Sequence, residues 1–163
     1  MTGDPPPPAI DLAPMRDNEL PLVAELNIQL QIDEAAAVVM TLENAAARMR
    51  GWIDHDNHHA LLARPAGQPD AQPVGYLVYA EHHDDCNHGH TMLYIRQFLV
   101  RREHRRQGIG RAMMDAFHRQ IVPPNTPVEM DVLLSNPAGH AFWQAVGFTD
   151  RFVRLRHEPP AAP

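Results

Sequence analysis

Four segments of the chain place apolar residues at the spacing of an α-helix. The first is expected to run from Asp17 or Asn18 to about residue 32, and the second from Thr41 to about residue 51. The third covers 107–121 and stops before Pro123.

The fourth helix is expected to follow Asn136, with Pro137 at its first position and Gly147 after its end. The residues on the predicted buried faces are, in chain order, Leu20, Val23, Ala24, Leu26 and Leu30; Ala45, Met49 and Trp52; Ile109, Ala112, Met113, Ala116, Phe117 and Ile121; and Ala138, Ala141, Phe142 and Ala145.

Short apolar runs between these helices predict strands. Their ranges are 9–15, 59–63, 74–80, 92–100, 127–134 and 151–155. Strands that alternate with helices in this order predict a mixed sheet with helices packed on it, an α/β or α+β domain.

The chain of 163 residues has the length of one domain. Both ends are rich in proline, so we expect a disordered leader over 1–8 and a disordered tail over 158–163. The single folded domain is therefore expected over 9–157.

Basic residues gather in one part of an acidic protein. The sequence has 14 Lys and Arg residues, 20 Asp and Glu residues and a formal net charge of −6. All the basic residues are arginines, and six of them fall within 96–111. Arginine binds phosphate oxygens in pairs, which predicts a local phosphate site. General binding to nucleic acid or to an anionic membrane is not expected, because the overall charge is negative and no aromatic stacking platform accompanies the run.

The segment RREHRRQGIG, residues 101–110, combines this charge with two glycines between a predicted strand and the third helix. The first turn of a helix presents amide N–H groups without intrahelical partners and the positive end of the dipole. Gly108 and Gly110 carry no β-carbon that would block a ligand. We therefore expect a pyrophosphate to bind here. The side chains that could add charge are Arg105, Arg106 and Arg111.

Two other phosphate-binding patterns do not fit this segment. A P-loop needs a lysine, and the chain contains none. The dinucleotide fingerprint needs a third glycine where Met113 stands. The remaining alternative is a solvated basic surface without a ligand.

Two motifs resemble the GNAT superfamily of N-acetyltransferases. RRQGIG (105–110) matches the signature Q/R-x-x-G-x-G/A, and NPAGHAFWQAVGF (136–148) resembles N-x-x-A-x-x-F-Y-x-x-x-G-F. The resemblance covers about residues 70–150, while 9–63 agree only in the order of elements. It implies a GNAT-like fold, with a mixed, mostly antiparallel central sheet flanked by about four helices.

The resemblance also implies acetyl-CoA as co-substrate. The main chain of 98–100 would pair with the pantetheine arm, and the amide of Leu99 would polarise the thioester carbonyl. The amides of 107–111 would hold the pyrophosphate. The residues expected to bind the coenzyme are Phe98, Leu99, Val100, Arg105, Arg106, Gln107, Gly108, Ile109, Gly110, Arg111 and Asn136.

Two residues of the family pattern are replaced. The tyrosine placed to protonate the leaving thiolate corresponds to Trp143, whose indole is a donor but a very weak acid. A glutamate often found on the fourth strand corresponds to Gln97, which cannot act as a base. An amine with a pKa of about 10 must lose a proton before it attacks. The candidates to accept it, each equally explained as a structural residue, are Asp131, Glu129, Tyr94 and His140.

The activity implied by the resemblance is direct transfer to a primary amine in a ternary complex. The acceptor would be a small molecule such as an aminoglycoside, a polyamine or an amino acid, or else a peptide amine. The acidic segment 32–37 borders the acceptor cleft in the family, and the net charge favours a basic acceptor; the alternative is a solvated linker. A GNAT-fold sensor that binds acyl-CoA with little catalysis remains open, as do the acyl chain length and the oligomeric state. Family members are often dimers, so a homodimer is one expected assembly.

Two histidine-rich segments, 55–59 and 82–90, contain residue types that bind zinc or nickel. Neither has the ligand spacing of a metal site on a predicted scaffold, so we expect solvated loops and no metal. Cys86 is the only cysteine, which excludes an intramolecular disulfide. With no signal peptide and no apolar stretch of membrane-spanning length, a cytoplasmic protein is expected.

Overall fold

The computed structural model describes residues 8–84, 89–155 and 157. Residues 1–7 of the expected leader and all of the expected tail lie outside this part of the chain. The elements are, in chain order, β1 (Ile10–Pro14), η1 (Asp17–Glu19), α1 (Leu20–Asp33), α2 (Leu42–Asp54), β2 (His58–Pro65), β3 (Gly75–His83), β4 (Thr91–Val100), η2 (Arg102–His104), α3 (Ile109–Gln120), β5 (Val128–Met130) and α4 (Pro137–Ala145).

The described strands form one sheet in the order β1-β2-β3-β4-β5. Neighbours from β1 to β4 are antiparallel, whereas β5 runs parallel to β4. The predicted α+β architecture with a mixed, mostly antiparallel sheet is therefore confirmed.

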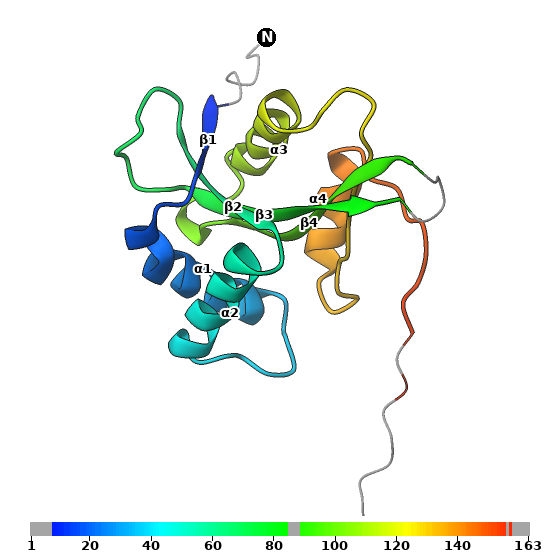
Figure 1. Cartoon of the computed structure of the whole chain (residues 1–163), viewed down its shortest axis with the longest axis horizontal. Coiled ribbons are helices and arrows are strands. Elements are labelled where there is room, and N and C mark those ends of the chain that lie inside the picture. Colours follow the sequence, from blue (N-terminus) through cyan, green and yellow to red (C-terminus); the bar gives the residue numbers. More distant parts are fainter. Residues whose placement is uncertain (1–7, 85–88, 156, 158–163) are drawn as a thin grey trace, which may run out of the picture.

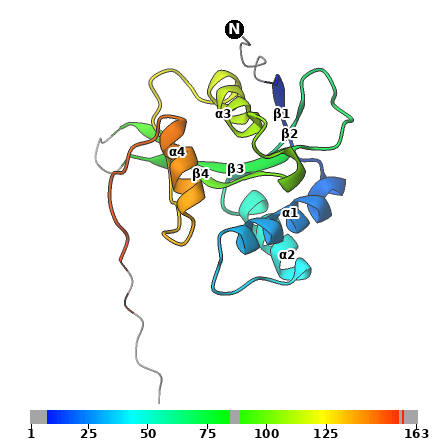
Figure 2. The ribbon, with the colours of Figure 1, turned by 180° about the vertical axis from the view of Figure 1, so that it is seen from behind.

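The sheet is covered on both faces (Figure 1). Helices α1 and α2 lie on one face, where Val23, Met49 and Tyr76 are fully or almost fully buried. Helices α3 and α4 lie on the other face, as the reverse view also shows (Figure 2). There Phe117 and Trp143 belong to one buried cluster. The burial of apolar surface on both faces is the main source of stability for such a three-layer domain.

Several local predictions are confirmed. Thr41 caps α2, because its Oγ1 accepts a hydrogen bond of 3.2 Å from the amide of Asn44. Gly147 follows α4 with a φ of 102°, a conformation that L residues rarely adopt. The predicted apolar stripe of α3 is buried, apart from half-buried Ile121 beyond its end.

The predicted strand over 151–155 is wrong. These residues have no regular structure, and Phe152, Val153 and Leu155 are 65 %, 73 % and 88 % exposed. Their alternation of apolar and polar residues fits a strand, but a strand forms only where an edge can pair with it. The neighbouring β5 spans three residues, far fewer than the predicted 127–134, and offers little edge.

The predicted buried face of α4 also needs correction. Ala138, Ala141 and Ala145 are exposed, while Trp143 is the buried residue of this helix. The large aromatic side chain decides which side of a short helix packs on the sheet, because it buries far more apolar area than an alanine.

A bulge interrupts the pairing of β3 with β4. Val78 pairs with Gln97, whereas the next residue, Tyr79, pairs with Ile95. Arg96 is thus the additional residue, and a bulge of this kind re-aims the side chains beside it.

Candidate active site

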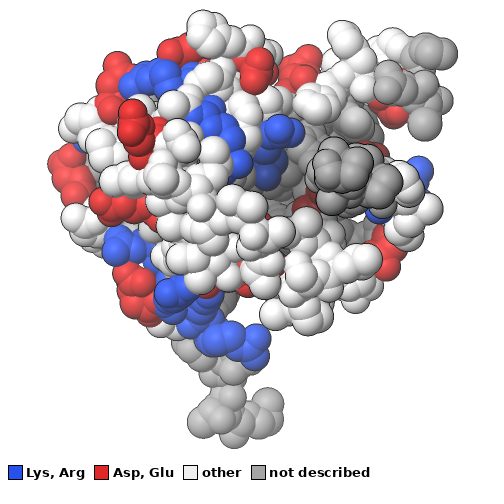
Figure 3. Space-filling view, turned by 90° about the horizontal axis from the view of Figure 1, so that it is seen from below, with Lys and Arg blue, Asp and Glu red and all other residues white. Residues whose placement is uncertain are grey.

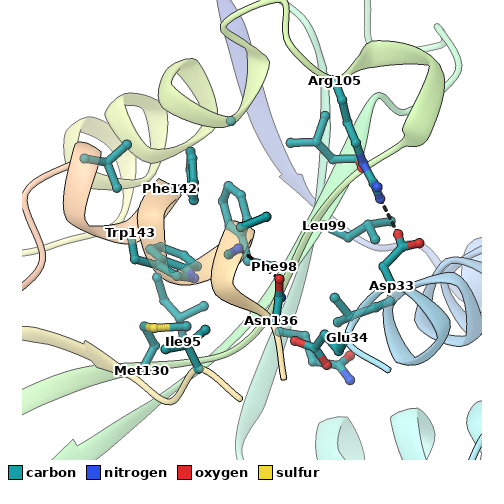
Figure 4. A pocket seen from close by; sticks show the side chains of 18 of the residues that line it. Asp33, Glu34, Ile95, Phe98, Leu99, Arg105, Met130, Asn136, Phe142 and Trp143 are labelled. Atoms are coloured by element: carbon teal, nitrogen blue, oxygen red, sulfur yellow. Dashed lines mark hydrogen bonds and ion pairs between the residues drawn. The ribbon is translucent and has the colours of Figure 1, made fainter. Parts of the chain in front are cut away.

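A pocket of about 600 Å³ lies beside β4. Figure 4 shows Asp33 and Glu34, at the end of α1, on one side of it and Phe142 and Trp143 of α4 on the other. All the residues expected to bind the coenzyme line this pocket, except Gln107. The exposed side chain of Gln107 instead donates a 3.0 Å hydrogen bond to the carbonyl of Glu103.

One wall of the pocket is an edge of β4 with which no strand of the described chain pairs. Strand β5 pairs with β4 only from Leu93 to Ile95, and beyond this point β4 continues to Val100 without it. An extended ligand can therefore lie along the main chain of this segment.

The register fixes which amides of β4 face that edge. The amide of Arg101 donates a 2.9 Å hydrogen bond to the carbonyl of Val74 on the β3 side. Backbone groups alternate along an antiparallel pair, so the amide of Leu99, which pairs with Tyr76, also points to β3. The amides of Phe98 and Val100 point to the open edge. The expected role of the Leu99 amide therefore does not fit this register.

The start of α3 forms a second wall. The first intrahelical amide to find a partner is that of Ala112, which donates a 3.0 Å hydrogen bond to the carbonyl of Gly108. The amides of Ile109, Gly110 and Arg111 come before it and have no acceptor within the helix. Together with the helix dipole, they form an arrangement suited to an anion.

The two glycines of this turn are needed for different reasons. Gly108 has a φ of 76°, and an added β-carbon would meet only Pro8, at 3.6 Å. Its requirement is the left-handed backbone itself. At Gly110 a β-carbon would lie 2.9 Å from the ring of Phe142, so its requirement is the close packing of α3 on α4.

The arginines of the turn are not equivalent. Arg105 donates to the carboxylate of Asp33 and, at 2.9 Å, to the carbonyl of Val100. Arg111 donates to the carbonyl of Ala145 at 2.7 Å. Arg106 is exposed, and in the described chain no acceptor or carboxylate is bonded to it. Arg106 is thus the arginine most available to a ligand.

The positive charge of the surface is local. In Figure 3, arginines form separate groups with acidic side chains between or beside them. Asp33 contributes to this balance, because it binds both Arg102 and Arg105 from the end of α1.

Asp33 and Glu34 are adjacent but respond oppositely to their surroundings. Burial acts to raise the pKa of Asp33, but hydrogen bonds from Arg105 and Arg102 outweigh it and the pKa is lowered. Burial, followed by the charge of Asp33, raises the pKa of Glu34. Glu34 lines the pocket and was missed as an individual site residue, although the sequence marked the acidic segment around it.

The start of α4 lies beside the end of α1, because the hydroxyl of Ser135 donates a 2.9 Å hydrogen bond to the carbonyl of Glu34 (Figure 4). The Oδ1 of Asn136 accepts a 2.9 Å hydrogen bond from the amide of Gly139 and caps the helix, as predicted. The ring of Trp143 is held between Phe98 and Phe148, with centroids 5.1 Å and 5.0 Å away. Trp143 therefore has a clear structural role in the aromatic core.

Of the candidate proton acceptors, Asp131 alone lines the pocket. It pairs with Arg154 at 2.9 Å, and burial and then the charge of Asp131 raise the pKa of nearby Tyr94. His140 pairs with Asp150 at 2.7 Å, outside the pocket.

The histidine-rich segments contribute stacking contacts in this structure. His59 stacks on Tyr79 and His82 on Tyr94. Asp85, Cys86 and His88 lie outside the described residues. Among the residues that are described, no group of three His, Cys, Asp or Glu side chains is placed to hold a metal ion. Likewise, no helix in the described ranges has both the length and the apolar character needed to cross a membrane.

No curated protein matches the chain. Among solved structures, a possible acetyltransferase from Clostridium difficile 630 superimposes with a TM-score of 0.73 and 14 % identity, over 94 % of this chain and 99 % of the other. The aminoglycoside N-acetyltransferase AAC(6')-Iy, in complex with CoA, gives a TM-score of 0.69 and 16 % sequence identity. This match covers 96 % of this chain and 99 % of the other.

An aminoglycoside acetyltransferase from an uncultured soil metagenomic sample, in complex with sisomicin, superimposes with a TM-score of 0.66 and 14 % sequence identity. The match covers 92 % of this chain and 96 % of the other. At these identities the structures establish the fold. The model of the acetyltransferase (GNAT) family matches residues 26–148, most of the chain and both of its signature motifs. The chain therefore belongs to the GNAT acetyltransferase family.

Proposed function

We propose that this protein transfers the acetyl group of acetyl-CoA to a primary amine of a small molecule, by direct attack in a ternary complex. One observation carries the proposal: the open amides at the start of α3 and the unpaired edge of β4 line the same pocket. A ligand with an anionic end and an extended arm fits that combination, and coenzyme A has both.

The residues present fit this co-substrate. The amides of Ile109, Gly110 and Arg111 would hold the pyrophosphate, with Arg106 adding charge from outside. The edge of β4 would hold the extended arm by main-chain hydrogen bonds, and Asn136 would contact it from the start of α4.

When bound, acetyl-CoA supplies the acetyl group as a thioester. The amides of Phe98 and Val100 face the open edge, so one of them would donate a hydrogen bond to the thioester carbonyl and stabilise negative charge that develops there. The walls of the pocket orient the amine for in-line attack, which removes much of the entropic cost of bringing two reactants together.

A proton must leave the amine before or during attack. Glu34 and Asp131 are the pocket-lining carboxylates that no arginine of the turn occupies. Burial raises the pKa of Glu34 toward the range in which a base is effective. We propose Glu34 as the first candidate for this role, ahead of Asp131, whose charge is already paired with Arg154.

The acceptor is an amine of a small molecule in this proposal, with a peptide amine as the alternative. Two structural neighbours are named as aminoglycoside acetyltransferases, which supports a small-molecule acceptor at the level of the fold. Trp143 lines the pocket where the family pattern has a tyrosine, and its indole is a very weak acid, so release of the thiolate would depend on water.

The test is thiol release from acetyl-CoA in the presence of a panel of amines, together with calorimetry of coenzyme binding. We expect coenzyme binding and turnover on at least one small amine. Binding without turnover on any amine would favour a sensor of acyl-CoA, and absence of binding would reject the coenzyme site.

A further inference from the structure

A chain of hydrogen bonds runs from α2 to the wall of the pocket, and its direction is fixed at its start. The guanidinium of Arg48 can only donate, and it donates to Oδ1 of Asn27 at 2.6 Å. Gln31 donates to the same oxygen at 2.7 Å, while its own Oε1 accepts from the amide of Met40. The Oδ1 atom of Asn27 therefore already accepts two hydrogen bonds.

The same order of donors and acceptors continues from Asn27 to β4. With its oxygen occupied, Asn27 turns its amide nitrogen toward the hydroxyl of Tyr76, at 3.4 Å. Tyr76 is fully buried and has one proton, which it donates to Oε1 of Gln97 at 3.1 Å. The amide group of Gln97 is thereby oriented.

The group that remains is Nε2 of Gln97, which can only donate. Gln97 lines the pocket, and within the described part of the chain no residue accepts a hydrogen bond from this nitrogen. It is also not among the buried polar atoms that lack a partner. The nitrogen is therefore accessible, and the pocket presents a fixed donor at this position.

The bulge in β4 involves the residue before Gln97, the cationic Arg96, which lines the same pocket. Arg96 is the additional residue of the bulge, and its guanidinium lies over the ring of Trp52, 4.8 Å from the centroid. Arg96 and Gln97 therefore both meet the α1–α2 layer, although successive residues of a regular strand would point to opposite faces. Arg96 lines the pocket and is exposed, and among the described residues no carboxylate pairs with it.

We infer that the acceptor amine carries a carboxylate close to its amino group, as an amino acid does, and that Gln97 and Arg96 select it. This inference rests on the proposed transfer to an amine and narrows its substrate class. A fixed amide donor and a guanidinium that no described carboxylate pairs with line one pocket, and a carboxylate can accept hydrogen bonds from both. A polyamine would place positive charge against Arg96 and leave Nε2 of Gln97 without an acceptor.

The test compares three ligands that share one side chain: an L-amino acid, its amide and its decarboxylated amine. Tyrosine, tyrosinamide and tyramine form one set, and histidine, histidinamide and histamine another, with kanamycin as a polycationic comparison. For the wild type we expect kcat/KM to fall from amino acid to amide to amine, by about tenfold in total.

Two variants separate the contributions. Gln97→Leu should reduce the preference for the amide over the amine about threefold, through KM. Arg96→Gln should reduce the preference for the amino acid over the amide by a similar factor. The matched controls are Gln68→Leu and Arg151→Gln, exposed residues outside the pocket, which should keep the wild-type order.

Tyr76→Phe tests the orientation itself. Without the hydroxyl, the Gln97 amide is free to turn, so the amide-to-amine preference should fall while coenzyme affinity is kept. A wild type that prefers tyramine, histamine or kanamycin, or a preference that survives Gln97→Leu and Arg96→Gln, would overturn the inference and leave the acetyltransferase proposal standing. Absence of turnover on every amine would overturn both.

Discussion

The two sides of the pocket are built in different ways. The side toward α3 consists mainly of main-chain groups from one continuous segment, 98–111, set by a strand edge, a left-handed glycine and a helix start. The side toward α1 and α2 consists of side chains, and one of them, Gln97, is held from behind by hydrogen bonds among side chains of four separate elements. Main-chain sites tolerate many changes of side chain, whereas a side-chain network depends on each member. We therefore expect substitutions on the two sides to damage different properties.

The largest expected effect is on the main-chain side. Gly108→Trp should weaken coenzyme binding more than about 100-fold, because the side chain would cover the open amides at the start of α3. Isothermal calorimetry measures this directly.

Gly67→Trp is the matched control, since Gly67 has a φ of 72° and also has free space around it. Both variants should lose a similar, small amount of stability, on the order of 1–2 kcal/mol, from the left-handed backbone. Normal coenzyme affinity in Gly108→Trp would show that the pyrophosphate binds elsewhere.

The next effect tests the side-chain network. Asn27→Leu leaves Arg48, Gln31 and Tyr76 without their shared partner, and should cost about 2 kcal/mol of unfolding free energy or more. Urea denaturation gives the value, with exposed Asn44→Leu as control. Coenzyme affinity should change little, and a large loss of it would break the separation between the two sides.

A smaller effect distinguishes the arginines of the turn. Arg106→Ala should weaken coenzyme binding about tenfold without changing Tm, because its guanidinium has no partner among the described residues. The KM for the amine should change less. The control is Arg151→Ala, which removes another exposed arginine. If it weakens coenzyme binding equally, the loss in Arg106→Ala reflects the change in net charge and not a specific contact.

The smallest effect concerns Asp33 and Glu34, which lie between the two sides of the pocket. The lowered pKa of Asp33 stabilises the fold above the ordinary pKa of 3.8, and this contribution is lost as pH falls. The raised pKa of Glu34 has the opposite sign: its contribution is complete below 4.5 and is lost as pH rises through the raised pKa.

Asp33→Asn should therefore lower Tm at pH 7 and Glu34→Gln should raise it, each by about 1–3 °C. Both differences should shrink as the pH approaches 3. Thermal melts of the two variants between pH 3 and 8 measure this, and shifts of the same sign at pH 7 would contradict it.

The sequence predicted the main-chain side of the pocket better than the side-chain side. The turn 105–110, the cap at Asn136 and the stripe of α3 depend on residues close together in the chain, and all were predicted. The link from Asp33 to Arg105 and the chain from Asn27 to Gln97 were not, because they join residues far apart. The bulge at Arg96 leaves no pattern in a mostly apolar strand, yet it decides that Arg96 and Gln97 meet the same layer.

Two errors have a related cause. The segment 151–155 has the alternation of a strand, but pairing depends on a neighbouring edge that local sequence does not encode. The resemblance to the family implied the Leu99 amide as the donor to the thioester, but the direction of that amide depends on the register with β3.

The guanidinium groups around the pocket have one further consequence. Arginine stays protonated at any pH the protein withstands and is a poor nucleophile, and the printed sequence contains no lysine whose side chain could be acylated in its place. This member of an acetyltransferase family thus has no side-chain amine that could compete for an acyl group. Mass spectrometry after prolonged incubation with acetyl-CoA should therefore find no acylated side-chain amine on the protein.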